Sequence, residues 1–296
     1  MKDKIDPILT LQAVNIRFGG IHALKNIHFN VKRNSITALI GPNGAGKTTL
    51  FNCITGFYRA KGKLLFHLPE KTFSLPKVLG EPFHLSHFIH PIDFFACLYY
   101  KMFGGSHLVT QAGIARTFQT IRLFREMTVI ENLLVAQYHT ANKNLLAGLF
   151  NLKGFQRWEK SAIDAAFLWL EKFDLLHEAN RLAGELSYRQ QRYLEIARSM
   201  CLLPKLLCLD EPAAGLNKQE TEGLQILLQT LRKEYNLTIL LIEHDMSLVM
   251  KVSDHIIVLD QGSVISEGSP KEVREDKKVI SAYLGEKENE EKKENE

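Results

Sequence analysis

One short segment of the sequence has the residue pattern of a phosphate-binding loop. Gly41-Pro42-Asn43-Gly44-Ala45-Gly46-Lys47-Thr48 fits G-x-x-x-x-G-K-[ST], between an apolar run at Ser35–Ile40 and a helical pattern at Thr48–Thr55. Glycines let backbone N–H groups turn around an anion, and the helix N-terminus adds its positive dipole end. Lys47 would reach the β- and γ-phosphates, and the Thr48 hydroxyl would bind Mg²⁺. The segment therefore predicts a nucleoside triphosphate site.

A pair of carboxylates after a buried strand is the second candidate for chemistry. Leu206–Leu209 is apolar throughout, and Asp210 and Glu211 follow it directly. In a parallel sheet, ligands bind where the carboxyl ends of the strands meet. Asp210 could hold Mg²⁺ beside Thr48, and Glu211 could polarise an attacking water. An acidic pair alone is weak evidence, but together with the phosphate loop it predicts nucleotide hydrolysis.

Five further motifs resemble those of the ATP-binding cassette (ABC) ATPases, and they stand in that family's order. A lone His or Phe at such a place is usually a loop or core residue, but five in order are hard to explain by chance. The motifs are Phe18 (the aromatic that stacks on adenine), Gln119 (the Q-loop), Leu186-Ser187-Tyr188-Arg189-Gln190 (the signature), Ala214–Asn217 (the D-loop) and His244 (the switch).

The resemblance implies a site shared between two cassettes that pair head to tail, with ATP and Mg²⁺ as cofactors. Glu211, His244 and Gln119 would be catalytic: Glu211 orients or deprotonates water, and His244 contacts the γ-phosphate. Thr48, Gln119 and Asp210 would bind Mg²⁺. Nucleotide binding would involve Phe18, Gly41, Pro42, Asn43, Gly44, Ala45, Gly46, Lys47, Thr48 and Thr49 in cis, with Ser187, Arg189 and Gln190 in trans.

The signature departs from the family pattern LSGGQ at both glycines, which are Tyr188 and Arg189 here. Tyr at the first position is familiar in some branches of the family, whereas Arg at the second is unexpected. A glycine there lets a backbone N–H approach the γ-phosphate. Arg189 could hinder that approach, or its charge could contribute to phosphate binding. Either way we expect retained but altered activity.

The sequence around these motifs resembles one branch of the family, the branched-chain amino acid importers. The matching runs are Arg116–Gln119, Ile121–Ala136, Asp210–Asn217, Leu241–Met246 and Ala282–Glu286. This likeness implies an ATP-hydrolysing subunit paired with a like or unlike ATPase subunit. The pair would dock beneath two membrane permease subunits, at the cytoplasmic face of the inner or plasma membrane, and an extracytoplasmic solute-binding protein would deliver the substrate. No nucleic acid partner is expected.

Other functions fit the motifs less well. Related ABC systems, such as amide or urea importers and the lipopolysaccharide exporter, share some of these sequence motifs. A non-transport ABC ATPase usually carries two cassettes or a long coiled coil, and this chain has one phosphate loop and no sustained heptads. A P-loop kinase or a purely structural nucleotide-binding module would lack the signature and His244.

The surrounding pattern predicts an α/β fold of the P-loop NTPase, ABC ATPase type. Apolar runs alternate with helical segments after Leu203, which indicates a mostly parallel core sheet covered on both faces. The ATPase core would comprise 1–115 and 183–285, with an antiparallel N-terminal β-subdomain. A helical subdomain at 116–182 would form the coupling surface. There, the stripe Met127, Val129, Ile130 and Leu133 would be either core or a docking face for a membrane subunit.

Composition narrows the class of protein. The 296 residues are 45% hydrophobic with a net charge of +4, which is ordinary for a globular protein and too small to argue for nucleic acid. The longest apolar runs fall short of the roughly 20 residues of a membrane-spanning helix. Met1–Pro7 lacks a secretory h-region, and four cysteines without a CxxC pair are typical of reduced thiols. Residues 286–296, with six Glu and three Lys, predict a disordered acidic tail.

The segment 61–109 is the part least explained by the resemblance, because it is longer than expected and its sequence is unlike that of the family. Its histidines include His84, His87 and His90, three residues apart, which raises the alternative of a metal site. They have no accompanying Cys or carboxylate set, and Pro82 and Pro91 lie close by. An elaborated β-subdomain or a contact with a partner or membrane is the favoured interpretation.

Overall fold

The computed structural model describes residues 6–80, 98–102, 104–138 and 153–283. Predicted features outside these ranges, namely His84, His87, His90 and the tail at 286–296, lie outside the described residues. Within them, no helix is long and apolar enough to cross a membrane, and no group of three or more His, Cys, Asp or Glu is placed to hold a metal ion.

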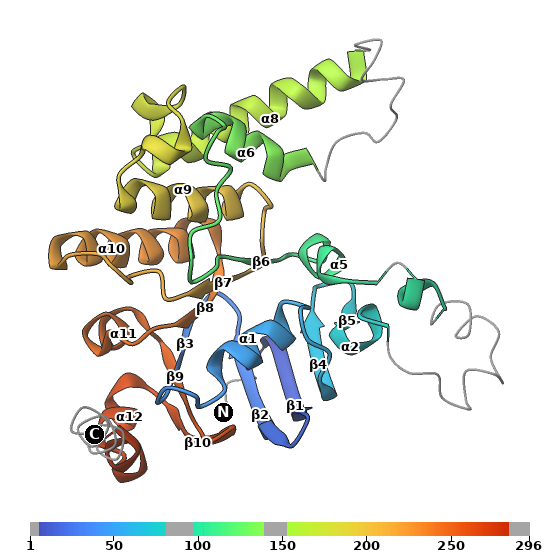
Figure 1. Cartoon of the computed structure of the whole chain (residues 1–296), viewed down its shortest axis with the longest axis vertical. Helices are drawn as coiled ribbons and strands as arrows, with labels where there is room; N and C mark the ends of the chain where they lie inside the picture. The colour runs from blue at the N-terminus through green and yellow to red at the C-terminus, as the bar shows by residue number, and fades with distance from the viewer. Residues whose placement is uncertain (1–5, 81–97, 103, 139–152, 284–296) are drawn as a thin grey trace.

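An antiparallel sheet of four strands forms the N-terminal layer (Figure 1). Its order is β2 (Ile21–Lys32), β1 (Pro7–Phe18), β4 (Lys61–His67) and β5 (Thr72–Ser74). The Gly19–Gly20 turn joins β1 to β2. Every charged side chain on these four strands is basic: Arg17, Lys25, Lys32, Lys61 and Lys63.

A second sheet of six strands forms the centre of the molecule. Five strands are parallel, in the order β9 (His255–Asp260), β3 (Ile36–Ile40), β8 (Thr238–Ile242), β7 (Leu206–Asp210) and β6 (Ile114–Arg116). The hairpin partner β10 (Ser263–Gly268) adds an antiparallel edge. Every residue of β3, β7 and β8 is buried, which explains their unbroken apolar runs.

Helices and the first sheet cover the two faces of this central sheet. Alternate residues of β7 show the division: Leu207 and Leu209 belong to one core cluster, and Leu206 and Cys208 to the other. The first cluster contains α9 (Tyr188–Met200) and α10 (Lys218–Tyr235), and the second contains α1 (Lys47–Ile54) and the antiparallel sheet. The remaining elements of the two layers are α11 (Met246–Val252), α12 (Pro270–Glu275), α5 (Ser106–Gln111) and the short α2 (Leu75–Val78).

The helical subdomain stands at one end of the molecule (Figure 1). It contains α6 (Val129–Gln137) and α8 (Lys153–Lys172), followed by two 3₁₀ turns at Leu176–Glu178 and Ala183–Glu185. In the stripe predicted to be either core or docking face, Val129 and Leu133 are fully buried and Ile130 partly so, whereas Met127 is exposed. The stripe is therefore mostly core.

Candidate nucleotide site

The phosphate loop joins β3 to α1, and its backbone requires glycine at two positions. Gly41 has a φ of 147° and Gly46 a φ of 102°. A Cβ on Gly41 would lie 2.0 Å from the Leu259 carbonyl oxygen, and one on Gly46 would lie 2.8 Å from that of Ala23. The loop is thus packed against its neighbours so tightly that side chains at these positions would displace it.

The start of α1 suits an anion. Lys47 is buried, and its Nζ donates hydrogen bonds to the carbonyl oxygens of Gly41 (2.6 Å) and Pro42 (2.9 Å), which holds its charge inside the loop. Within the described residues, α1 has no side-chain N-cap and no acidic residue in its first turn, and Thr48 is exposed. Backbone N–H groups, a positive helix end and an ammonium group therefore converge where phosphates would bind.

Asp210 lies at the carboxyl end of β7, as predicted, and it is almost fully buried. Its Oδ2 pairs with Nη2 of Arg116 at 2.8 Å. Burial raises the pKa of Asp210 above its usual range, and the hydrogen bond and charge of Arg116 oppose that shift. Arg116 also donates hydrogen bonds to Asn52 and Thr55, one on α1 and one at its end. This arginine, quoted only as part of a motif in the sequence, ties the strand edge to the phosphate-loop helix.

Glu211 stands between Gln119 and His244. Gln119 Nε2 donates to Glu211 Oε2 at 3.0 Å, and His244 Nε2 lies 2.8 Å from Glu211 Oε1. Glu211 has a φ of 49°, and its N–H donates to Ile242 O at 2.9 Å. The fold thus brings together three residues from three separate segments that the sequence had grouped only by resemblance.

Glu243 contacts two of these segments, although no motif in the sequence singles it out. It is buried, and its carboxylate accepts hydrogen bonds from the N–H groups of Ala213 (2.7 Å) and His244 (3.1 Å). Burial raises its pKa, and the backbone N–H groups of Ala213, His244 and Asp245 oppose the shift. An acidic residue inside an otherwise apolar strand end is the signal that could have identified it.

The signature forms the start of α9. Ser187 caps the helix: its hydroxyl accepts from Gln190 N–H at 3.3 Å, and Gln190 Oε1 accepts from Ser187 N–H at 3.0 Å. The Arg189 guanidinium lies 5.0 Å from the centre of the Tyr193 ring, one turn further along. The side chain therefore runs along the helix and not across its N-terminus.

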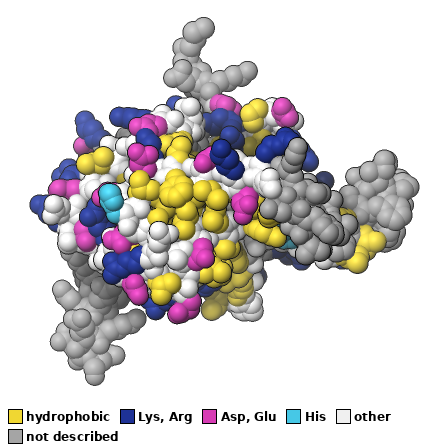
Figure 2. All heavy atoms as spheres, turned by 90° about the horizontal axis from the view of Figure 1, so that it is seen from above, with side chains coloured by type: hydrophobic (Ala, Val, Ile, Leu, Met, Phe, Trp, Pro, Cys, Tyr) yellow, Lys and Arg dark blue, Asp and Glu magenta, His cyan; other side chains and the backbone are white. Residues whose placement is uncertain are grey.

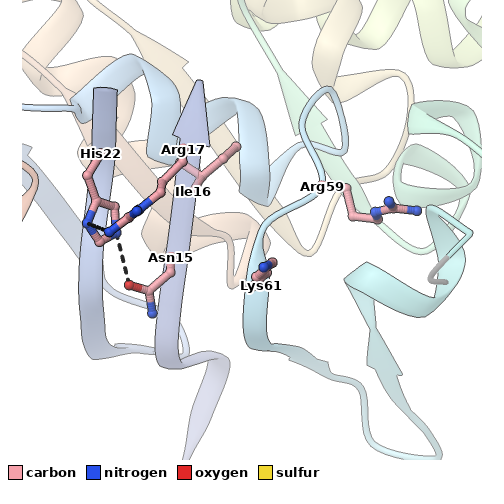
Figure 3. Close-up of a pocket in the computed structure, with 6 residues that line it drawn as sticks. All are labelled: Asn15, Ile16, Arg17, His22, Arg59 and Lys61. Atoms are coloured by element: carbon pink, nitrogen blue, oxygen red, sulfur yellow. Dashed lines mark hydrogen bonds between the residues drawn. The ribbon is translucent and has the colours of Figure 1, made fainter. Parts of the chain in front are cut away.

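Phe18 ends β1 with 44% of its surface exposed and contacts Tyr58 edge to face, with ring centres 5.1 Å apart. The residues next to these two aromatics, Arg17 and Arg59, line a pocket together with Asn15, Ile16, His22 and Lys61 (Figure 3). Burial and the neighbouring charges of Arg17 and Lys25 lower the pKa of His22. This pocket beside β1 is therefore strongly basic.

The oxygen atoms at this site are of the kind that Mg²⁺ prefers. The Thr48 hydroxyl, the Asp210 carboxylate and the Gln119 amide are hard oxygen donors, and they come from α1, the end of β7 and the segment after β6. The chemistry of these donors therefore suits a nucleoside triphosphate and its metal ion.

Comparisons with known proteins agree with this geometry. The ABC transporter family model matches residues 24–214, and a model of branched-chain amino acid ATP-binding cassette transporters matches residues 263–289. The chain is 46% identical to the high-affinity branched-chain amino acid transport ATP-binding protein BraF of Pseudomonas aeruginosa, covering 95% of this chain and 98% of that protein. It is 45% identical to LivG of Salmonella typhimurium, with the same coverage.

Solved structures give the same result. An ATP-binding cassette of an ABC transporter in its ADP conformation, MJ1267, superposes with a TM-score of 0.72 at 32% identity, covering 94% of this chain and 99% of that chain. The chain belongs to the ABC transporter ATP-binding proteins. Within them its relatives are the branched-chain amino acid transport group of BraF and LivG, so the predicted family, branch and fold are confirmed.

Proposed function

We propose that this chain hydrolyses ATP to power a membrane importer of branched-chain amino acids. The observation that carries the proposal is the position of Glu211, which is hydrogen-bonded to both Gln119 and His244. Glu211 follows Asp210 at the carboxyl end of β7, and Arg116 links Asp210 to the phosphate-loop helix. The substrate class is supported by relatives whose names specify branched-chain amino acid transport and that match almost end to end.

In this proposal, Lys47 and the N–H groups of the phosphate loop bind the phosphates, and Phe18 stacks on the adenine. Thr48, Asp210 and Gln119 hold Mg²⁺, which would neutralise charge on the phosphate oxygens. Glu211 orients or deprotonates the attacking water, and its hydrogen bonds to Gln119 and His244 fix the direction of its carboxylate. His244 then stands next to the position of the γ-phosphate.

The proposed partners are a second ATPase subunit, two permease subunits and, through them, a solute-binding protein. The second cassette would bring its signature, Ser187 to Gln190 in this numbering, to the phosphate loop of the first. For the permeases we propose the face of the helical subdomain. A cavity of about 230 Å³ between α6 and the end of α9 is lined by Phe124, Val135 and Leu202 and also by Arg116 and Arg198. Figure 2 shows hydrophobic side chains gathered on this end of the molecule. The chain would then lie at the cytoplasmic face of the membrane.

Replacing Glu211 by Gln tests the proposal. Gln keeps the size of the side chain but removes the base, so the purified variant is expected to bind ATP, lose most hydrolysis and associate into a dimer, alone or with a sister cassette. Bound nucleotide and molar mass would be measured together after ATP addition, with Lys47→Ala as the control that abolishes binding. If the Glu211→Gln protein hydrolyses ATP like the unmodified chain, Glu211 is not the base. If neither the unmodified chain nor the Glu211→Gln variant retains ATP, the proposed function itself is wrong.

A further inference from the structure

A buried ion pair on α9 holds the backbone of the segment that carries Gln119. Arg192 and Glu195 have fully buried side chains, 0% exposed, with Nη1 and Oε2 3.2 Å apart. Arg192 Nη1 donates to the Phe118 carbonyl oxygen and Nη2 to that of Gln119, both at 3.0 Å. Glu195 Oε1 accepts from the N–H groups of Phe118 (3.4 Å) and Arg122 (3.3 Å). Four backbone groups around Gln119 are thereby bound to one helix.

The same arginine also binds the signature. Arg192 Nη2 donates a hydrogen bond to the hydroxyl of Tyr188, the third residue of that motif, at 2.9 Å. The Tyr188 ring also packs on the D-loop, because a Cβ on Gly215 would lie 2.9 Å from Tyr188 Cε1. One guanidinium therefore joins the signature to the Q-loop within a single chain, and Gln119 continues the path to Glu211 at 3.0 Å.

Stability is a poor explanation for this arrangement. Burying two charges costs more than a surface pair, and apolar replacements of such pairs are often neutral or stabilising. Arg192 Nε is also buried with no hydrogen-bond partner among the described residues, which adds a desolvation cost. Burial raises the pKa of Glu195, against the N–H groups of Arg122 and Phe118 and the charge of Arg192. What the pair does provide is a fixed Q-loop backbone.

We propose that Arg192, with Tyr188 and Glu195, is a positioning residue that sets the Q-loop so that Gln119 reaches Glu211, and that the Tyr188 hydroxyl makes this setting depend on the signature. The inference rests on the proposed ATPase function. Neither Arg192 nor Tyr188 is required to contact the reacting atoms in cis. Their effect is expected on the rate of hydrolysis and not on the affinity for ATP.

The test compares three variants of the full chain by kcat and KM for ATP, thermal unfolding, and hydrogen exchange of the amides at 118–122. Tyr188→Phe removes only the hydroxyl, and Arg192→Lys keeps the charge beside Glu195 but loses the fork that binds two carbonyl groups. Tyr193→Phe is the matched control on the same helix: it keeps the ring under Arg189, and its hydroxyl has no hydrogen-bond partner among the described residues.

Tyr188→Phe is expected to lower kcat by about fivefold and Arg192→Lys by at least about tenfold, which is 1.4 kcal/mol or more in the barrier. In both variants KM should stay within about twofold, and hydrogen exchange at 118–122 should become faster. In Tyr193→Phe, kcat and hydrogen exchange should both equal those of the unmodified chain. If Tyr188→Phe melts like the unmodified chain and also hydrolyses and exchanges like it, the proposal is overturned, whether or not Arg192→Lys folds. A chain that hydrolyses no ATP in any form, yet shows the exchange differences, would refute the ATPase function and leave the positioning of the Q-loop standing.

Discussion

Single residues at the site combine backbone strain with buried charge. Glu211 adopts a left-handed conformation without being glycine, and Asp210 and Glu243 are buried carboxylates whose pKa values burial raises. Such features cost stability and persist where neighbouring contacts over-determine them. Here those contacts come from Arg116, for Asp210, and from three backbone N–H groups, for Glu243.

Replacing Arg189 distinguishes two roles for this side chain: hindering the approach of a backbone N–H to the phosphate, or contributing positive charge to phosphate binding. Its guanidinium lies over Tyr193, so Arg189→Gly removes a positive charge near the predicted partner nucleotide and puts a flexible residue into the first turn of α9. We expect ATP hydrolysis to fall by about two- to fivefold, equivalent to about 0.5–1 kcal/mol. Arg189→Lys, which keeps the charge, should retain more activity. A clear gain in rate for Arg189→Gly would instead mean that the side chain hinders phosphate contact.

The buried carboxylate of Glu243 predicts how the stability of the chain depends on pH. Because its folded-state pKa is raised, the native state binds more protons than the unfolded state between the ordinary Glu pKa, about 4.3, and the raised value. Its contribution to the free energy of unfolding therefore decreases as pH rises through that window. Glu243→Gln removes this term, so the variant should gain stability relative to the unmodified chain as pH rises from about 4 to 8.

Urea unfolding of both proteins across this pH range measures the difference. A stability difference that does not change with pH would show that Glu243 titrates as it does in the unfolded chain. The substitution also replaces one acceptor oxygen by a donor facing Ala213 N–H or His244 N–H. We therefore expect slower hydrolysis in the variant even at the pH where its stability matches.

At the scale of elements, long periodic segments were predictable and short ones were not. The alternation of apolar runs and helical segments expected after Leu203 is present as β7, α10, β8 and α11, and Ser269 caps α12. By contrast, β6 has three residues and is a strand only because β7 lies beside it. The antiparallel edge β10 was missed as well. Such strands depend on pairing partners far away in sequence, which local pattern does not encode.

The residues of the candidate site likewise divide into those that could be predicted from the sequence and those that could not. Motif residues such as Lys47 and Glu211 were selected from the sequence because their spacing carries information. Arg116, Arg192 and Glu243 were not, since each acts through backbone groups or side chains of distant segments. Arg116 and Glu243 could be recognised as charged residues next to apolar runs, whereas Arg192 stands among the polar residues of α9 and has no such signal.

The cap of α6 gives a prediction for an element. Thr128 and Glu131 form a reciprocal capping box at the start of that helix, and α6 packs on α8 in the helical subdomain. Thr128→Ala is expected to destabilise the chain by about 1 kcal/mol, with faster hydrogen exchange in α6 than in α10. Ser269→Ala, which breaks the equivalent box of α12, is the control. Equal exchange in α6 with and without the Thr128 hydroxyl would contradict the prediction.

At the scale of the molecule, the nucleotide site and the helical subdomain are joined by the segment after β6. Phe118 and Gln119 are bound to α9, and Phe124 is bound to α6, since Asn132 Oδ1 accepts from Phe124 N–H at 2.9 Å. A displacement of the helical subdomain would therefore reach Gln119 through about five residues of chain, a spacing counted along the sequence.

Docking of the proposed membrane subunits can be tested at this surface. Val135 is exposed on α6 and lines the cavity with Phe124. Val135→Asp places a charge on the apolar face and should reduce co-purification with the permease subunits by about tenfold or more, while ATP binding is unchanged. Ile280→Asp, at a similarly exposed position far from α6 in sequence, is the control. Unimpaired co-purification of Val135→Asp would place the contact elsewhere.

The four-stranded sheet has a consequence for how the protein behaves in the laboratory. Its five basic side chains are matched by no acid on the same strands, whereas the whole chain has a net charge of only +4. The remainder of the chain therefore has a slightly negative net charge, so positive charge is concentrated on this sheet. The molecule should adhere to a cation-exchange resin by one end, even at its isoelectric point near pH 8.7, and elute later than a protein of equal net charge whose charges are evenly spread.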